Sequence, residues 1–227
     1  MLIGNPTPAL PTPSPLLSDV LASAPDPRRA AEMWANALGG DSIAAADLVV
    51  FLPNRSRGLA ARAFFDANAP APVLREAMTV AWCQDHSEVT SAFGLKLLRT
   101  ALHRCRFDTS MLPARLTVYR GGRAAQGVVA RGLSWSTRRD AAAWFAHSWD
   151  GRDGAGKLRH NPRTGLPIIL KVDVERSHIL ATFMSRGEFE IVLRTPRLRP
   201  ALDTDDAAEI AKLSRAWAAS SRLLSSE

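Results

Sequence analysis

The stretch Pro113-Ala114-Arg115-Leu116-Thr117-Val118-Tyr119-Arg120-Gly121-Gly122 marks the point at which the chain changes from a helical to a β pattern. After Pro113, short runs rich in β-branched and aromatic residues appear, and residues 116–119 alternate as a half-buried strand does. Further strands are expected at residues 132–136, 168–174, 179–181 and 189–193. A helix over residues 138–147 interrupts them, and a capped helix over residues 205–224 follows them.

The part of the chain before Pro113 has a helical pattern. Asp26 followed by Pro27 predicts a helix start, an oxygen cap before a proline at the first helical position, and Gly39 with Gly40 predicts its end. Further helices are expected at residues 43–51, 57–67, 71–84 and 87–106. Helices first and strands later favour the α+β class with an antiparallel or mixed sheet over an alternating α/β arrangement.

The length of 227 residues suits one sizeable core or two small ones, and one domain is the default expectation. Residues 1–27 hold seven of the fifteen prolines, so residues 1–26 are predicted to form a proline-rich flexible tail. The remainder, residues 27–227, is predicted to be one domain. Its parts are expected to be a helical lobe at 27–110, a β-rich core at 111–202 and a C-terminal helix at 203–227.

The net charge of +7 lies entirely in the second half of the chain, since residues 1–110 carry ten basic and ten acidic residues and the rest carry nineteen and twelve. Such a half suits an anionic ligand, either a dinucleotide or a nucleic-acid backbone, although an arginine-biased solvated surface explains it equally well. The sequence shows neither a signal peptide nor a membrane span. We therefore expect a cytoplasmic protein, or one delivered into a host cell.

Two cysteines and two histidines, Cys83, His86, His103 and Cys105, are the residue types that zinc prefers. His103 and Cys105 are two positions apart in a helical stretch and should point to different faces. No metal site is therefore expected.

Three groups of residues could carry chemistry, and the first is Arg120 with Gly121 and Gly122. A guanidinium at the end of a strand can make a forked contact with a phosphate, and the glycines would let a ligand approach the backbone. An arginine at a strand end is also an ordinary surface residue.

The second group is Ser134 and Ser136, which would face the same side of a strand and could line one wall of a cleft. The serines could instead cap the helix that follows. In that helix Trp144 is expected in the core, whereas Phe145 could cover a flat ring.

The third group is Glu188 and Glu190, expected on one face of a strand with Val192. Phe189, Ile191 and Leu193 would occupy the opposite, core face. Carboxylates about 7 Å apart are spaced as a pair for sugar chemistry would be, although a solvated charged face remains the alternative.

In this order and spacing, the three groups resemble the mono-ADP-ribosyltransferases of the arginine-serine-glutamate class, which includes many bacterial toxins and related phage and effector enzymes. The resemblance covers about residues 114–195. It rests on a Tyr-Arg-Gly strand, a serine strand before an Ala-x-x-Phe-Ala helix, a strand ending Ile-Leu-Ala, and a Glu-x-Glu strand continuing Ile-Val-Leu. The family's fold implies a helical lobe followed by a mixed or antiparallel two-sheet β core.

The resemblance implies a role for each site residue. Arg120, beside Gly121, would hold NAD near its phosphates. Ser134 would orient the catalytic glutamate, Glu190, and Glu188 would activate the acceptor.

Other positions follow from the same resemblance. Phe145 would lie near the nicotinamide, Ser136 would complete the hydroxyl wall, and residues 182–187 would form the target-recognition turn. The family's usual Ser-Thr-Ser is Ser134-Trp135-Ser136 here, which leaves the packing of Trp135 open.

The expected function is therefore mono-ADP-ribosylation, in which NAD is the substrate, no metal takes part, and the acceptor is a macromolecule, with protein arginine as the first choice. An NAD glycohydrolase on the same fold and a non-catalytic basic nucleic-acid-binding module are the alternatives.

Overall fold

The computed structural model describes residues 15–147, 165–184, 189–194 and 199–224. The chain divides into two compact units, Met1–Cys105 and Arg106–Glu227, which are considered separately. Within the described ranges there are eight α-helices and one six-stranded antiparallel sheet, so the α+β class is confirmed. That the two units form a single domain stays a prediction.

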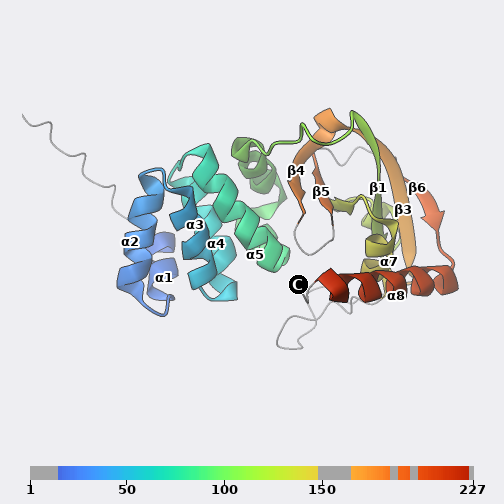
Figure 1. Ribbon diagram of the computed structural model, residues 1–227, viewed down its shortest axis with the longest axis horizontal. Coiled ribbons are helices and arrows are strands. Elements are labelled where there is room, and N and C mark those ends of the chain that lie inside the picture. Colours follow the sequence, from blue (N-terminus) through green and yellow to red (C-terminus); the bar gives the residue numbers. More distant parts are fainter. Residues whose placement is uncertain (1–14, 148–164, 185–188, 195–198, 225–227) are drawn as a thin grey trace, which may run out of the picture. The chain divides into compact units, whose positions relative to one another are not determined.

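The first unit is helical and contains α1 (Pro15–Ala22), α2 (Pro27–Leu38), α3 (Ser42–Phe51), α4 (Asn54–Asp66) and α5 (Ala71–Cys105) (Figure 1). Asp26 caps α2 as predicted, because its carboxylate accepts the backbone N–H of Arg29. The backbone of α5 departs from helical geometry at Asp85 and Gly94. The predicted break between residues 84 and 87 is confirmed, and Asp85 accepts the N–H groups of the two residues that restart the helix, Ser87 and Glu88.

The predicted tail at residues 1–26 is wrong for its second half. Residues 15–22 form α1, in which Leu17 and Val20 are buried. The Ser23 hydroxyl lies 2.8 Å from that of Ser56 in α4. Burial of apolar side chains therefore outweighs the local proline content. Residues 1–14 lie outside the described part of the chain.

The core of the first unit depends on close helix packing. The rings of Trp34 in α2 and Phe64 in α4 stack with centroids 4.3 Å apart. Gly58 in α4 faces the backbone of Glu88 in α5 so closely that a methyl group would not fit. The two helices can approach each other here only because position 58 has no side chain.

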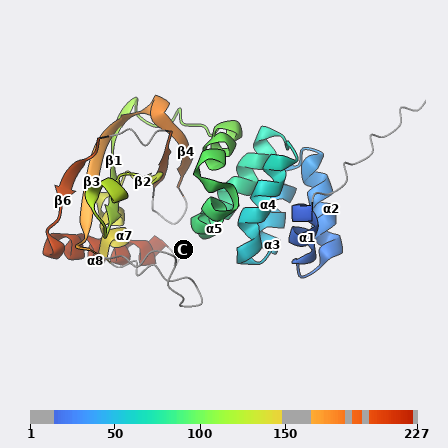
Figure 2. The same cartoon turned by 180° about the vertical axis from the view of Figure 1, so that it is seen from behind.

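The second unit is built on the strands β1 (Arg115–Gly122), β2 (Ser134–Ser136), β3 (Ile168–Glu175), β4 (Ile179–Phe183), β5 (Glu190–Leu193) and β6 (Ala201–Thr204). They pair in the order β4-β5-β2-β1-β3-β6, and each neighbouring pair is antiparallel. Figure 2 shows the short β2 between β4 and β1. The described strands are hydrogen-bonded as one six-stranded sheet, because β2 pairs with a strand on each side, and the expected two-sheet core stays a prediction. Strand β6 was not predicted.

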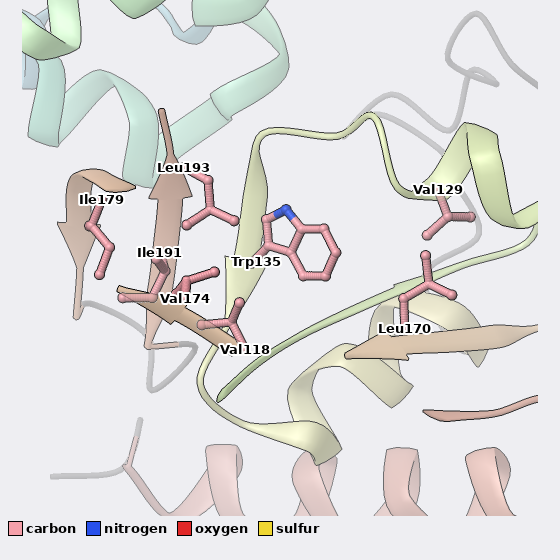
Figure 3. Close-up of a cluster of buried hydrophobic side chains, with 8 residues drawn as sticks. All are labelled: Val118, Val129, Trp135, Leu170, Val174, Ile179, Ile191 and Leu193. Carbon is pink, nitrogen blue, oxygen red and sulfur yellow. The ribbon is translucent and has the colours of Figure 1, made fainter. Parts of the chain in front are cut away.

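One face of this sheet carries an apolar cluster with Trp135 at its centre (Figure 3). Ile191 and Leu193 lie in it, as predicted. The prediction for Phe189 is wrong, because β5 begins at Glu190 and Phe189 has a positive φ of 46° with 40% of its surface exposed. The left-handed backbone at this position ends the alternation that would have turned its ring inward.

A second apolar cluster joins the sheet to the helices α7 (Arg139–His147) and α8 (Ala207–Leu224), both close to their predicted bounds. Alanines of α7 pack against Ile169 of β3 and Ile210 of α8. Trp144 is half-buried, with its ring 4.9 Å from that of Trp217 in α8. Two short elements complete the unit, α6 (Gln126–Val129) and the 3-10 turn Arg176–His178.

Candidate active site

Three residues singled out from the sequence, Arg120, Ser134 and Glu190, lie on neighbouring strands and are linked by two hydrogen bonds. They lie on β1, β2 and β5, which are consecutive in the sheet. Arg120 Nη1 donates a hydrogen bond to the Ser134 carbonyl oxygen, and Ser134 Oγ donates one to Glu190 Oε1. One serine therefore connects the arginine to the carboxylate.

Glu190 is a buried carboxylate at the first position of β5. Its side chain is only 8% exposed, and its backbone pairs with Ser136 on one side and Phe183 on the other. None of the ion pairs in the described part of the chain involves Glu190. Glu190 is therefore a buried carboxyl group that the Ser134 hydroxyl orients through a hydrogen bond.

Arg120 projects from β1 onto Gly132, the residue two positions before Ser134. A methyl group built at Gly132 would overlap the guanidinium atoms of Arg120. Arg120 is half-buried, and its Nη1 contact is with a neutral carbonyl oxygen. A guanidinium held in this way is oriented by the backbone that surrounds it.

Ser136 has a capping contact. It is buried, and its Oγ accepts the backbone N–H of Arg138 at 2.9 Å, immediately before α7 begins. This is the helix-capping interpretation raised from the sequence. A contact of Ser136 with NAD stays a prediction.

Gly121 and Phe145 both lie next to α7. A methyl group at Gly121 would overlap the backbone carbonyl oxygen of Ala142, so packing of α7 on β1 accounts for a glycine there. Phe145 is half-buried, with its ring edge-on to Trp144 at 5.0 Å. Contacts of either residue with NAD remain predictions.

The second carboxylate, Glu188, lies outside the described residues, as do positions 185–187 of the expected target-recognition turn. The described neighbours of that segment, Met184 and Phe189, are both exposed. The role of Glu188 therefore stays a prediction.

The sequence did not single out Gly132 or Trp135 for a part in the site. Trp135 is 3% exposed, and its indole Nε1 donates to the Gly132 carbonyl oxygen at 3.1 Å. The doubt about its packing is resolved, because alternation on β2 turns the large ring into the core and Ser134 away from it. The sequence shows Gly132 two residues before Ser134, but it does not show that Gly132 contacts Arg120, because the two residues lie on different segments of the chain.

The cysteines and histidines do not converge. His103 is exposed and Cys105 is buried, as their spacing predicted, and burial raises the pKa of the Cys105 thiol to about 12. Across the described ranges, no group of three or more His, Cys, Asp or Glu side chains is placed to hold a metal ion. No helix in those ranges is long and apolar enough to cross a bilayer.

Comparisons of the chain with protein-family models, curated proteins and solved structures found no match.

Proposed function

We propose that the protein is a mono-ADP-ribosyltransferase that cleaves NAD at the bond between nicotinamide and ribose and transfers ADP-ribose to an acceptor. The observation that carries the proposal is the connection of Arg120 to Glu190 through Ser134. The three residues are up to 70 positions apart in the sequence (120 to 190), and the sheet brings their strands together.

Glu190 would stabilise the transition state. Nicotinamide attached to ribose is already a cationic pyridinium, so it leaves as a neutral molecule with the bonding electrons and needs no general acid. Positive charge then develops on the ribose as an oxocarbenium ion. A buried carboxylate held in place beforehand stabilises such a charge, and groups of this kind typically contribute several kcal/mol.

Arg120 and Ser134 would prepare the site for the reaction. The Arg120 fork suits the pyrophosphate of NAD, which carries negative charge in the ground state and the transition state alike. The Ser134 hydroxyl donates a hydrogen bond to Glu190, and the Ser134 carbonyl oxygen accepts one from Arg120. One residue would therefore fix the orientation of both side chains.

Glu188 would act on the acceptor. The nucleophile forms a bond with the ribose carbon that nicotinamide leaves, and the proton that the nucleophile loses passes to Glu188 or to water. The products are ADP-ribosylated acceptor, nicotinamide and a proton. By the family resemblance, a glutamate at position 188 favours arginine as the modified residue.

We further propose that the second unit has the ADP-ribosyltransferase fold. A single backbone pair, Tyr119 with Ser136, joins β1 to β2. Strands β4, β5 and β2 on one side of this junction, and β1, β3 and β6 on the other, would correspond to the two sheets expected for that fold.

The other two functions have less support. An NAD glycohydrolase would use the same site, with water as the nucleophile. A nucleic-acid-binding surface would need available cations, whereas several basic side chains of the second unit are paired with acids. These pairs are Arg115 with Asp173, Arg138 with Asp140, and Arg139 and Lys171 with Asp203.

The decisive experiment uses NAD labelled in its adenylate part, incubated with the purified protein and either cell lysate or a small guanidine. We expect label on protein and on the guanidine, together with release of nicotinamide. Glu188→Gln should lose most of the labelling and keep slow nicotinamide release, while Glu175→Gln, a change at an exposed glutamate of β3, should behave as wild type. Nicotinamide release without label on any acceptor would support the glycohydrolase instead, and no release at all would overturn the proposal.

A further inference from the structure

Gly132 has a steric role that its backbone conformation does not explain. Its φ is not in the left-handed region, so other residues could adopt the same backbone there. A methyl group at this position would nevertheless overlap Cζ, Nε and Nη2 of Arg120. The position therefore requires the absence of a side chain, which leaves room for the guanidinium to lie next to the backbone.

The Gly132 peptide is held from two directions. Its N–H donates to the Val129 carbonyl oxygen at 3.2 Å, which ties it to the end of α6. Its own carbonyl oxygen accepts the indole N–H of Trp135 at 3.1 Å. Trp135 is in turn fixed among the buried side chains of the sheet, with Val118 and Ile191 among its neighbours (Figure 3).

We infer that Gly132 and Trp135 are positioning residues for Arg120. The buried Trp135 side chain holds the Gly132 peptide in place through its indole N–H. Because Gly132 has no side chain, the guanidinium of Arg120 can lie next to it and reach the Ser134 carbonyl oxygen. As far as NAD binding is concerned, the inference rests on the proposed function. Its geometric part does not.

The inference predicts an unusual outcome for Gly132→Ala. The group that the new methyl would displace is the end of a long flexible side chain, which can move without disturbing the backbone. The protein should therefore fold normally while Arg120 loses its position. Gly121→Ala would differ, because the displaced group there is the backbone of α7.

The test compares Gly132→Ala with Arg120→Ala, the double variant, and Gly127→Ala as the matched control. Gly127 lies in α6, five residues away in the same connection, and a methyl group there would meet nothing within 4 Å. The affinity of each purified protein for ADP-ribose, which has the pyrophosphate and no scissile nicotinamide bond, is measured by calorimetry. Crystal structures of wild type and Gly132→Ala locate the guanidinium, and thermal unfolding shows that each variant is folded.

We expect Gly132→Ala to weaken ADP-ribose binding at least tenfold, as Arg120→Ala does, and the double variant to bind no more weakly than Arg120→Ala. Gly127→Ala should bind as wild type does. Wild-type affinity in Gly132→Ala, or losses that multiply in the double variant, would overturn the inference.

The crystal structures separate this inference from the proposed function. If wild type failed to bind ADP-ribose, the proposed function would fail, and the position of Arg120 in Gly132→Ala would still decide the geometric part. A guanidinium still on the Ser134 carbonyl would overturn it, and a displaced one would support it. Trp135→Phe, which keeps an aromatic ring and loses the indole N–H, should shift Arg120 in the same direction by a smaller amount.

Discussion

Two clusters of opposite charge in the second unit are built on different principles. In the first, Arg139 of α7 pairs directly with Asp203 of β6 at 2.5 Å and with Glu209 of α8 at 2.8 Å, and Lys171 of β3 lies 3.3 Å from Asp203. In the second, Ser134 links Arg120 and Glu190 through two hydrogen bonds, one accepted by its carbonyl oxygen and one donated by its hydroxyl.

The difference separates a cluster held together by direct ion pairs from the one to which we assign the proposed reaction. Direct pairing satisfies the charges of the first cluster and joins four elements of the unit. It also raises the pKa of Arg139, chiefly through the hydrogen bond with Asp203. In the candidate site the serine keeps the two charges oriented without joining them to each other. In the proposed reaction, this arrangement would orient one group toward the anionic part of NAD and the other toward its cationic part.

Ser134→Ala gives the largest expected contrast between the clusters. Without the hydroxyl, Glu190 loses the group that orients it, and nicotinamide release should fall about tenfold to a hundredfold. Thermal stability should change little. The measurement is the rate of nicotinamide release. The control is Ser177→Ala, a change at an exposed serine of the 3-10 turn. Normal release by Ser134→Ala would remove the distinction between the clusters.

Asp203→Asn should show the reverse behaviour. The Asp203 side chain is 7% exposed, and its loss of charge leaves Arg139 and Lys171 without their shared partner. Because Arg139 is one third exposed and water screens it, we expect a loss of about 1 kcal/mol in the free energy of unfolding. Urea denaturation measures this loss. The turnover rate of the folded protein should be unchanged, and a large fall in turnover would show that the ion cluster also supports the site.

Glu209→Gln should have the smallest effect, and the effect should depend on pH. A hydrogen bond from Thr204, followed by one from Arg139, lowers the pKa of Glu209 below its ordinary 4.5. A lowered pKa in the folded state adds stability above about pH 4.5, and this contribution is lost as the pH falls through the lowered value. The difference in melting temperature between wild type and Glu209→Gln should therefore be present at pH 7 and shrink in acid. A difference that grows in acid would contradict the assignment.

Much of the fold follows from local chemistry that the sequence displays. Asp26 before Pro27 starts α2, and Asp85 restarts the helix within α5, because a carboxylate can accept free N–H groups wherever a helix begins. The helix α1 was missed because its stability comes from burial of Leu17 and Val20 against other elements, which local composition does not reveal. Strand β6 was missed because it has four residues and depends on pairing with β3.

The sequence singled out the residues of the candidate site, whose role stays a prediction, and it predicted their geometry only in part. Spacing on a strand correctly placed Ile191 in the core, but the positive φ of Phe189 interrupts the alternation, and spacing does not report it. The contact of Gly132 with Arg120 joins residues of different strands, and no periodicity reports it. Trp135 looked like a departure from the family pattern because only the folded sheet shows the face on which it lies.

The central claim is that Glu190 provides the negative charge that the cleavage of NAD requires. The most direct test is the initial rate of nicotinamide release by Glu190→Gln, with wild type and Glu175→Gln measured beside it after their folding is confirmed by circular dichroism. Glutamine keeps the size and hydrogen-bonding capacity of the side chain and removes its charge. We expect a rate lower than wild type by about 10² or more, with Glu175→Gln unaffected. Near-normal release by Glu190→Gln would contradict it.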